Sequence, residues 1–337
     1  MTADSANWRM PSAYLRLVLQ AAEAAGHPVA RVLAGTPLTA ERLRHSDRSV
    51  SFGATRTVLR NAERLLGPGW HLEVGKGLTA PAHGALGFAV VTAPTLEASL
   101  AVLLRFMGIR APFLWASGAI EDDAFVFRFF DAADMGDQRQ ALIELAALSL
   151  QGLIERPLGR EILGAILSFA YPEPAYGAAL RRAFHCDLAF GAERHSLRLP
   201  AAWLGQSCAL SDEAMHRYLL RRCEEELAAG AGAVPAELAV RQALLARPGS
   251  LPGLAEVAAA QHVSPRTLIR RLKRAGTSFR VIRDDVRQTV ARDFLLNSDL
   301  AISRIASRLG YQDPANFGRA FRRWHGVSPR AFRASRG

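Results

Sequence analysis

The sequence lacks the long apolar runs of membrane proteins. No stretch approaches eighteen uninterrupted apolar residues, so the chain predicts no membrane-spanning helix. The opening residues, MTADSANWRMPSAY, have no basic segment followed by an apolar one, so we expect a cytoplasmic protein. Cysteine is scarce as well, because only Cys186, Cys208 and Cys223 are present and none stands in a C-x-x-C spacing. Three cysteines cannot all pair, and reduced thiols are the simplest expectation.

Motifs of catalysis and metal binding are also missing. The chain has no G-x-S-x-G, no glycine-rich phosphate loop, no H-E-x-x-H and no Cys/His cluster at metal-ligand spacing. The adjacent His185 and Cys186 are more simply a satisfied core pair than a metal site or a nucleophile. The acidic run at 121–123 suits a hairpin turn better than a cation site, and the run at 224–226 suits a solvated helix face. We therefore expect no enzymatic activity, no cofactor and no metal.

Positive charge is concentrated at one end of the chain. The chain carries 42 Lys and Arg against 31 Asp and Glu, a net charge of +11. From residue 241 onwards there are 19 basic and 6 acidic residues, a net +13, so the preceding 240 residues carry −2. A tail that only aided solubility would be of low complexity, whereas this one has regularly spaced aromatic residues and therefore folds. The pattern predicts a polyanion-binding domain joined to a near-neutral one.

The basic region contains a repeat, whose clearest trace is GTSFRVIR at 276–283 and GVSPRAFR at 326–333. Each phrase closes a unit of short helix, tight turn and second helix. The first unit spans about 254–275, with His262 in the turn and Ser264 capping the second helix. The second unit spans about 301–325, with Gly310 in the turn and Asp313 as the cap. We expect the first phrase to open a helix joining the units, and the second to close the fold.

A helical wheel divides each second helix into an inward and an outward face. The inward residues are apolar: Leu268, Leu272 and Ala275 in the first helix, and Phe317, Phe321 and Trp324 in the second. The outward residues are mostly cationic: Arg266, Arg270, Lys273 and Arg274 in the first, and Asn316, Arg319, Arg322 and Arg323 in the second. One such face alone could be merely solvated. Two, each behind a matching helix and turn, favour two helix-turn-helix modules that place arginines in the DNA major groove.

A predicted helix at 279–296 lies between the modules, with Val286, Val290 and Phe294 at helical spacing. A single long helix would hold the modules at a fixed separation. Reading successive major-groove segments on one DNA face needs a spacing of about 34 Å.

The segments SPRTLIRRLKRAGTSF and ISRIASRLGYQDPANFGRAFRRWHGVSPRAFR strongly resemble the DNA-binding domain of AraC/XylS-type transcription regulators, over roughly residues 240–334. His262 departs from that family's pattern, which often has glycine or a small polar residue there. The resemblance implies base-edge contacts from Arg266, Ile269, Arg270, Ala315, Asn316 and Arg319. It implies phosphate contacts from Lys273, Arg274, Arg322 and Arg323.

The preceding region predicts an α+β domain over residues 1–230. Helical patterns occupy 12–25, 54–66, 95–109, 138–156 and 212–229, and strands are expected in 113–131, 162–174 and around 186–199. These elements mix without a regular βαβ rhythm. A small, flexible stretch predicts a linker at 231–238, which leaves 239–337 for the all-α DNA-binding domain.

Segments 83–106 and 167–200 resemble the effector domain of AraC/XylS regulators of the ornithine-utilisation type. That resemblance implies a domain that senses a small metabolite and supports a homodimer. The candidates for a ligand-facing role are His83, in a Pro-Ala-His-Gly-Ala loop, and the aromatic residues Phe88, Phe106, Phe113 and Trp115. Aromatic residues of this kind are more often core than pocket.

The sequence thus predicts a transcription regulator with double-stranded DNA, a small-molecule effector and RNA polymerase as partners. Two alternatives remain open. The N-terminal domain could be a protein-interaction module with no small-molecule effector. It could also be an enzyme tethered to DNA, as in alkyl-transfer repair proteins, which would require an activated cysteine.

Overall fold

The computed structural model describes residues 8–45, 49–131, 135–228, 236–245, 251–261, 263–297 and 300–334. The chain divides into two compact units, Met1–Val234 and Pro235–Gly337. The predicted linker at 231–238 spans this division. Its first five residues lie outside the described part, and its last three already belong to a helix, Ala236–Leu245.

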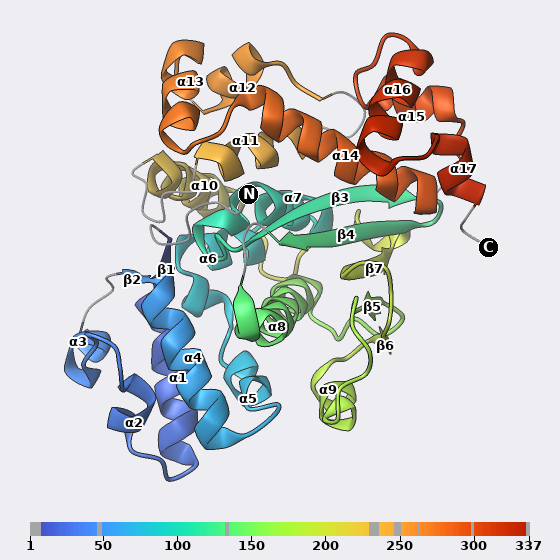
Figure 1. The fold of residues 1–337 in the computed structure, drawn as a ribbon. Coiled ribbons are helices and arrows are strands. Elements are labelled where there is room, and N and C mark those ends of the chain that lie inside the picture. The colour runs from blue at the N-terminus through green and yellow to red at the C-terminus, as the bar shows by residue number, and fades with distance from the viewer. Residues whose placement is uncertain are drawn as a thin grey trace. The chain divides into compact units, whose positions relative to one another are not determined.

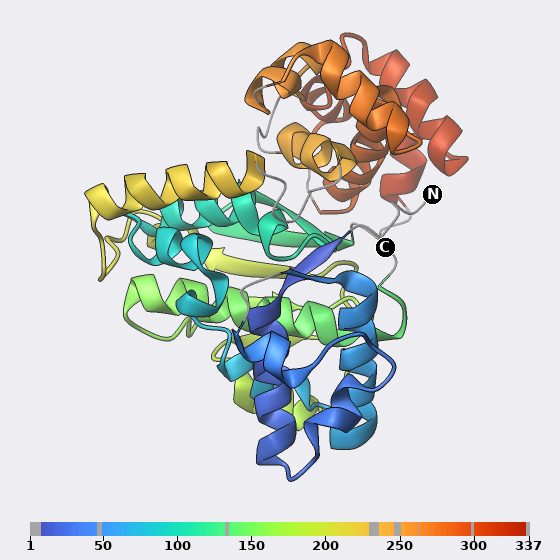
Figure 2. The ribbon, with the colours of Figure 1, turned by 90° about the vertical axis from the view of Figure 1, so that its left-hand side faces the viewer.

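The first unit combines ten helices with two small sheets among its described residues (Figures 1 and 2). The helices are α1 (Ser12–Ala24), α2 (Val29–Leu33), α3 (Ala40–His45), α4 (Phe52–Leu66), α5 (His71–Lys76), α6 (Ala85–Val91), α7 (Leu96–Phe106), α8 (Arg139–Leu158), α9 (Gly177–Ala183) and α10 (Glu213–Ala228). The five predicted helices correspond to α1, α4, α7, α8 and α10. Local caps explain two of the starts, because Ser51 and Thr95 accept backbone N–H groups three residues on.

The main sheet has the strand order β3-β4-β7-β5-β6. Its strands are β3 (Leu114–Glu121), β4 (Ala124–Asp131), β5 (Ile166–Ser168), β6 (Asp187–Ala189) and β7 (Ser196–Pro200), and all neighbours are antiparallel except β5 and β6. The predicted hairpin is confirmed, with Asp122 at φ +53° in its turn. The strands expected within 162–174 and 186–199 are shorter than predicted. A second sheet pairs β1 (Arg9–Pro11) with β2 (Ser49–Ser51).

Helix α8 is the central helix of this unit, since it packs against α5, α6 and α7. Its buried Glu144 is the centre of a polar cluster: the carboxylate contacts His71 Nε2 and accepts the hydroxyl of Tyr171 at 2.5 Å. Tyr176 and Gln140 complete the cluster. A buried charge needs such partners, so the cluster ties α5 and the segment around α9 to α8.

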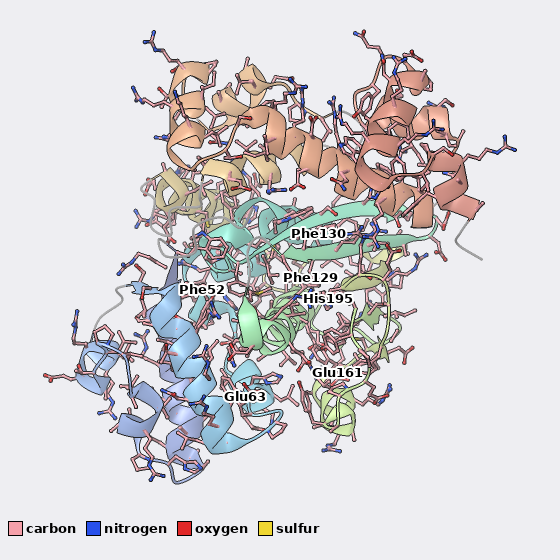
Figure 3. All side chains as sticks on the ribbon, in the orientation of Figure 1. Phe52, Glu63, Phe129, Phe130, Glu161 and His195 are labelled. Atoms are coloured by element: carbon pink, nitrogen blue, oxygen red, sulfur yellow. The ribbon has the colours of Figure 1, made fainter. Side chains whose placement is uncertain are left out.

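The aromatic core continues between α4 and the hairpin. Phe52, at the start of α4, stacks on Phe113, with ring centroids 5.7 Å apart. Figure 3 shows Phe52 and, on β4, Phe129 within this region. Together with the buried Phe127, these rings supply much of the apolar area that the unit removes from water.

The second unit is helical throughout its described residues (Figure 1). Its helices are α11 (Ala236–Leu245), α12 (Leu254–Ala260), α13 (Pro265–Arg274), α14 (Phe279–Asn297), α15 (Ile302–Arg308), α16 (Pro314–His325) and α17 (Pro329–Ala334). One core contains Ile282 and Val286 from the first half of α14, and a separate core contains Ala291 and Leu295 from its second half. Val290 contacts both. The predicted two modules on one long helix are confirmed.

Three expectations for this unit need correction. Ala275 is exposed, because α13 ends at Arg274 and Ala275 already belongs to the turn. Helix α11 was not predicted from the sequence, yet it packs on α14. The second phrase does not merely end the fold, since Pro329 opens α17 just as Phe279 opens α14.

Candidate nucleic-acid interface and effector cavity

Helix α13 presents the first outward face. Ser264 accepts the backbone N–H of Thr267 at 3.1 Å, which fixes where the helix begins. Leu268 and Leu272 are buried in the core of the module, and this fixes the rotation of the helix about its axis. The predicted base-contacting residues are consequently exposed to solvent: Arg266, Ile269 and Arg270. Ile269 is 50% exposed, which is unusual for an isoleucine and suits contact with a thymine methyl group.

Helix α16 presents the second outward face by the same means. Asp313 accepts the backbone N–H of Ala315 at 2.8 Å, and Phe317 and Phe321 are fully buried. The exposed Arg319 donates from Nη2 to the Asn316 side chain one turn earlier. The side chains of Ala315, Asn316 and Arg319 therefore lie together on the open face.

The predicted phosphate-contacting residues lie further along the two helices. The side chains of Lys273, Arg322 and Arg323 are exposed. The side chain of Arg274 lies outside the described residues, as does His262 in the first turn. In the described part of both helices, cations reach the flanks as well as the centre of the outward face, which is the distribution that backbone contacts require.

The two repeated phrases have the same local structure. Gly276 and Gly326 adopt left-handed conformations, with φ of +71° and +75°. Each follows the second helix of its module, α13 or α16, and stops it. The side chain of Ser278 then accepts the N–H of Val281 at 3.3 Å, and that of Ser328 accepts the N–H of Ala331 at 3.2 Å. The repetition in sequence thus encodes a helix stop followed by a capped helix start.

Two arginines whose structural roles were not predicted hold the second module together: Arg287, and Arg333, which matches the family's pattern. Arg287 on α14 donates from Nε to the carbonyl of Leu309 at 2.9 Å, and its guanidinium lies 4.6 Å from the centroid of the Tyr311 ring. Arg333 on α17 donates to the carbonyl of Leu300 at 2.6 Å. Arg333 stands at the end of the repeated phrase, which could have drawn attention to it. Nothing in the spacing distinguishes Arg287 from the other arginines of its helix.

The first unit contains a cavity of about 110 Å³, partly open to solvent, between α1, α8 and the β3–β4 hairpin. Most of its wall is aliphatic or aromatic, with Leu15 and Val18 from α1, Phe127 and Phe129 from β4, and Leu142 from α8. The polar residues in its wall are few, and they are Tyr14, Thr55, His83, Arg110 and Ser149. An apolar cavity with a few convergent polar groups is the usual form of a small-molecule site.

His83 is the centre of that polar group. Its Nδ1 is 2.7 Å from the Tyr14 hydroxyl, and its Nε2 is 2.8 Å from Ser149 Oγ and 3.3 Å from the carbonyl of Leu78. A carbonyl can only accept, so we assign the imidazole proton to Nε2, and Nδ1 accepts from Tyr14. Burial, together with a smaller effect of the Arg110 charge, lowers the pKa of His83 to about 4, so the ring is neutral at pH 7. Burial raises the pKa of the Tyr14 phenol above its ordinary value.

Arg110 connects the cavity to α10. It donates from Nε to the backbone carbonyl of His83 at 2.7 Å and from Nη2 to Glu226 at 2.8 Å. Glu226 is only 25% exposed and so departs from the solvated face predicted for residues 224–226, whereas Glu225 is exposed as predicted. Glu224 is also paired, with Arg105. Gly84 has a φ of +57°, which favours glycine at this point of the loop, and a Cβ there would lie 2.8 Å from Arg110 Nη2.

Two of the five ligand-facing candidates line the cavity, His83 and Phe113. The others do not. Phe106 is fully buried in the core, and Trp115 stacks on Phe130 at 3.7 Å. Phe88 is 44% exposed and lies on the outer side of α6. These residues are apolar as predicted, but apolar character alone does not distinguish a core residue from one that lines a cavity.

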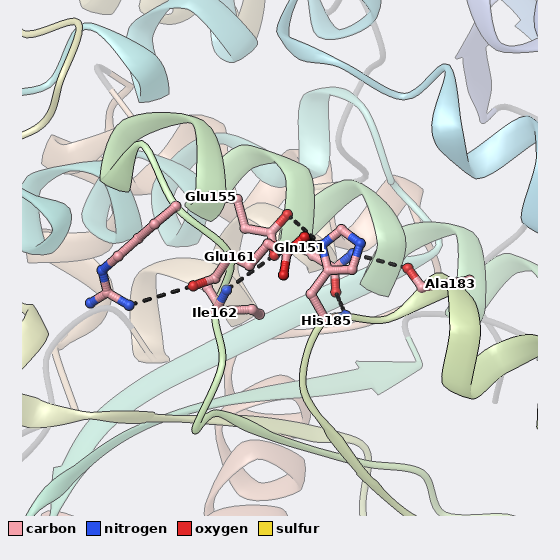
Figure 4. A network of polar contacts seen from close by, with 7 residues as sticks. Gln151, Glu155, Glu161, Ile162, Ala183 and His185 are labelled. Carbon is pink, nitrogen blue, oxygen red and sulfur yellow. Dashed lines mark hydrogen bonds and ion pairs between the residues drawn. The ribbon is translucent and has the colours of Figure 1, made fainter.

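The residues set aside as non-catalytic have structural partners. His185 contacts Glu155 at 2.9 Å, and its backbone N–H donates to Gln151, so this histidine joins α8 to the segment after α9 (Figure 4). We expected His185 in the core, but its side chain is only half-buried. Burial raises the pKa of the Cys186 thiol to about 12 and that of Cys223 to about 11, and also raises the pKa of Cys208. None of the three is therefore activated as a nucleophile.

The described residues hold neither a metal-binding cluster nor a membrane-spanning helix. They contain no group of three or more His, Cys, Asp or Glu placed to hold a metal ion. None of the described helices has the length and apolar character that crossing a bilayer requires.

Comparisons with known proteins agree with this division of the chain. A model of the arabinose-binding N-terminal domain of AraC transcription regulators matches residues 26–208, and a helix-turn-helix domain model matches residues 257–335. The ornithine utilization regulator of Pseudomonas aeruginosa is 30% identical over 285 residues, 84% of each chain. An uncharacterized HTH-type transcriptional regulator of Mycobacterium tuberculosis is 29% identical over 347 residues, 95% of each chain. The crystal structure of transcriptional regulator CdpR from Pseudomonas aeruginosa aligns with 95% of this chain and 97% of that chain, with a TM-score of 0.48 and 20% identity.

Proposed function

Since this chain belongs to the AraC family of transcription regulators, we propose that its N-terminal domain responds to a small metabolite bound in the cavity between α1, α8 and the hairpin. The observation that carries the proposal is the combination of an apolar wall with the Tyr14–His83–Ser149 group. A core that served packing alone would have no reason to bury a hydrogen-bonded histidine beside an empty volume.

On the DNA side, α13 and α16 enter successive major-groove segments. Arg266, Ile269 and Arg270 on α13 contact base edges, as do Ala315, Asn316 and Arg319 on α16. The cations at their flanks, which are Lys273, Arg274, Arg322 and Arg323, contact phosphates. These proposed DNA contacts are supported by the solvent exposure of the described side chains. They are also supported by the buried residues that fix the rotation of each helix about its axis. The phosphate contacts supply most of the affinity, and the base contacts supply specificity.

The regulator acts in the cytoplasm as a homodimer, and RNA polymerase is its further partner, as the family resemblance implies. Support for a self-contact comes from α10, where Met215 and Tyr218 are exposed, and from α6, which packs against α10 and exposes Phe88. Exposed apolar side chains on adjoining helices are typical of protein contacts. Sedimentation of the full chain tests this proposal. A Tyr218→Glu variant should shift the equilibrium towards monomer, and a chain that is monomeric throughout would contradict it.

The effector proposal is tested by a thermal-shift screen of the full chain against small acids, amines, alcohols, amino acids and sugars. A saturable rise in Tm is expected for one class of compound. Ala146→Phe on α8 should abolish the rise, because the new ring fills the cavity. Ala101→Phe on the exposed side of α7 is the matched control and should keep the rise.

A second candidate is a protein-interaction domain without an effector, which the exposed residues of α6 and α10 would also suit. If no compound shifts Tm and Ala146→Phe raises stability without loss of regulation, the cavity is only a packing defect. That outcome would favour the interaction module.

A further inference from the structure

The polar groups of the cavity are not a random selection. Among the described residues that line it, Arg110 is the one charged side chain and none is acidic. Arg110 is 17% exposed, so its guanidinium is largely screened from water and its field acts on the cavity. A cationic ligand in the cavity would face the guanidinium and not its counter-charge Glu226, which is no part of the wall. An anionic group could compete with Glu226 for the guanidinium.

The guanidinium also has donors to spare. Its five N–H groups form a fork, and the hydrogen bonds seen among the described residues use Nε and Nη2. With the single proton of His83 Nε2 shared between the carbonyl of Leu78 and Ser149 Oγ, the O–H of Ser149 can itself donate. Both residues contact His83, Arg110 at its carbonyl and Ser149 at Nε2, so a ligand carboxylate close to His83 would find two donors.

We propose that the effector is a compact apolar monocarboxylate whose carboxylate binds Arg110 in competition with Glu226. This inference rests on the proposed function and specifies the chemical class of its ligand. The apolar body lies among Leu15, Phe127 and Leu142, and the carboxylate lies towards Arg110 and Ser149.

The size of the cavity limits the apolar body. An engineered cavity of about 150 Å³ lined by aliphatic and aromatic residues holds benzene. At about 110 Å³ this cavity takes a branched four- or five-carbon chain or, with small adjustments of its wall, a six-membered ring. A long acyl chain or a sugar with several hydroxyl groups does not match the volume or the wall.

Competition for Arg110 would couple ligand binding to a conformational change at the end of α10. Glu226 lies in the last turn of α10, and the predicted linker begins five residues later, at residue 231. A ligand carboxylate on the remaining N–H groups of Arg110 would lie close to Glu226. Repulsion between the two carboxylates would weaken the Glu226–Arg110 pair, which is one of the contacts that hold the end of α10. Binding then favours the state in which the end of α10 is released.

The experiment uses the full chain and three compounds of one shape: cyclohexanecarboxylate, cyclohexylmethanol and cyclohexylmethylamine, with isovalerate as a smaller acid. Calorimetry and thermal shift should detect the acids and not the alcohol or the amine. Arg110→Gln should weaken binding of the acid by at least about tenfold, because a charge-assisted pair is lost.

The Glu226→Gln variant is expected to bind the acid more tightly than the wild type. A folding defect cannot produce this result, because it would weaken binding. Removal of the competing carboxylate should tighten acid binding several-fold. Glu224→Gln is the matched control: it removes the same charge from the same helix, but Arg105, its partner, does not line the cavity. Its affinity for the acid should equal that of the wild type.

Three results would overturn the inference. They are binding of the alcohol or the amine at least as tightly as the acid, weaker acid binding in Glu226→Gln, and no binding of any of the four compounds. In each case the wider metabolite screen with Ala146→Phe decides separately whether the cavity binds an effector at all. The ligand class can thus fail while the proposed function stands.

Discussion

The Nε–H of Arg287 donates to the carbonyl of Leu309 across 2.9 Å, and this bond joins the long helix α14 to the turn of the second helix-turn-helix module. Leu309 is the last residue before the left-handed Gly310, where carbonyls of a helix end lack partners within the helix. Nη2 of the same arginine lies 3.3 Å from the carbonyl of Gly310. One side chain therefore caps α15 and sets the position of α16 relative to α14.

Arg287→Ala should destabilise the second module by about 1–3 kcal/mol, because two backbone carbonyls lose a charged donor. Hydrogen exchange of the full chain checks this, with faster exchange expected across 302–325 and little change across 254–274. Arg280→Ala on the same helix is the control, since Arg280 is 82% exposed. Equal hydrogen-exchange rates across residues 302–325 in the two variants would mean that Arg287 does not stabilise the second module.

Arg270→Ala and Arg319→Ala should each lower affinity for the operator by about 1–3 kcal/mol and relax specificity at one base step. The reason is that each side chain is exposed on the outward face of a recognition helix whose rotation is fixed by buried residues. Binding to a randomised DNA library, followed by sequencing, measures both effects. A variant that bound operator and random DNA with equally reduced affinity would contradict base reading.

Arg322→Ala should weaken binding to all sequences alike and reduce the slope of log K against log salt by about one. Arg322 is exposed on α16, one turn beyond Arg319, and is placed to contact a phosphate. Titrations at several salt concentrations give the slope for wild type and variant. An unchanged slope would mean that this arginine contacts no phosphate.

Two histidines predict a loss of stability in mild acid. Burial lowers the pKa of both His83 and His195 to about 4, below the value of about 6.5 in an unfolded chain. The unfolded chain therefore binds more protons between these values. The free energy of unfolding of the N-terminal unit should fall as the pH drops from about 6.5 to about 4, by up to roughly 3 kcal/mol for each histidine.

His195→Gln tests one half of that expectation. The histidine's Nδ1 accepts the backbone N–H of Ala170, and protonation of that nitrogen would break this bond. Arg139 Nη2 lies 3.2 Å from Nε2, so its positive charge also disfavours a charged ring. Figure 3 shows the residue beside the sheet, near Phe129. Denaturant unfolding at pH 7 and pH 5 should show a smaller pH dependence in the variant. An identical dependence would mean that His195 does not titrate in this range.

Much of the DNA-binding unit could be predicted because its signals are local. Ser264 and Asp313 act on N–H groups two or three residues away, and the buried positions of α13 and α16 repeat at helical spacing. Ala275 was misplaced for a local reason as well, since a wheel cannot show where a helix stops. Arg287 was missed because its partner, Leu309, is 22 residues away.

In the N-terminal unit the sequence alone determined the type of most longer elements and the hairpin, through periodicity, caps and a turn. The tertiary structure decided which apolar residues form a core and which enclose a cavity, because the cavity wall draws on residues from Met10 to Leu153. It also decided that Glu226 pairs with Arg110, 116 residues earlier in the chain. Such contacts depend on how distant elements pack, and neighbouring residues carry no record of that packing.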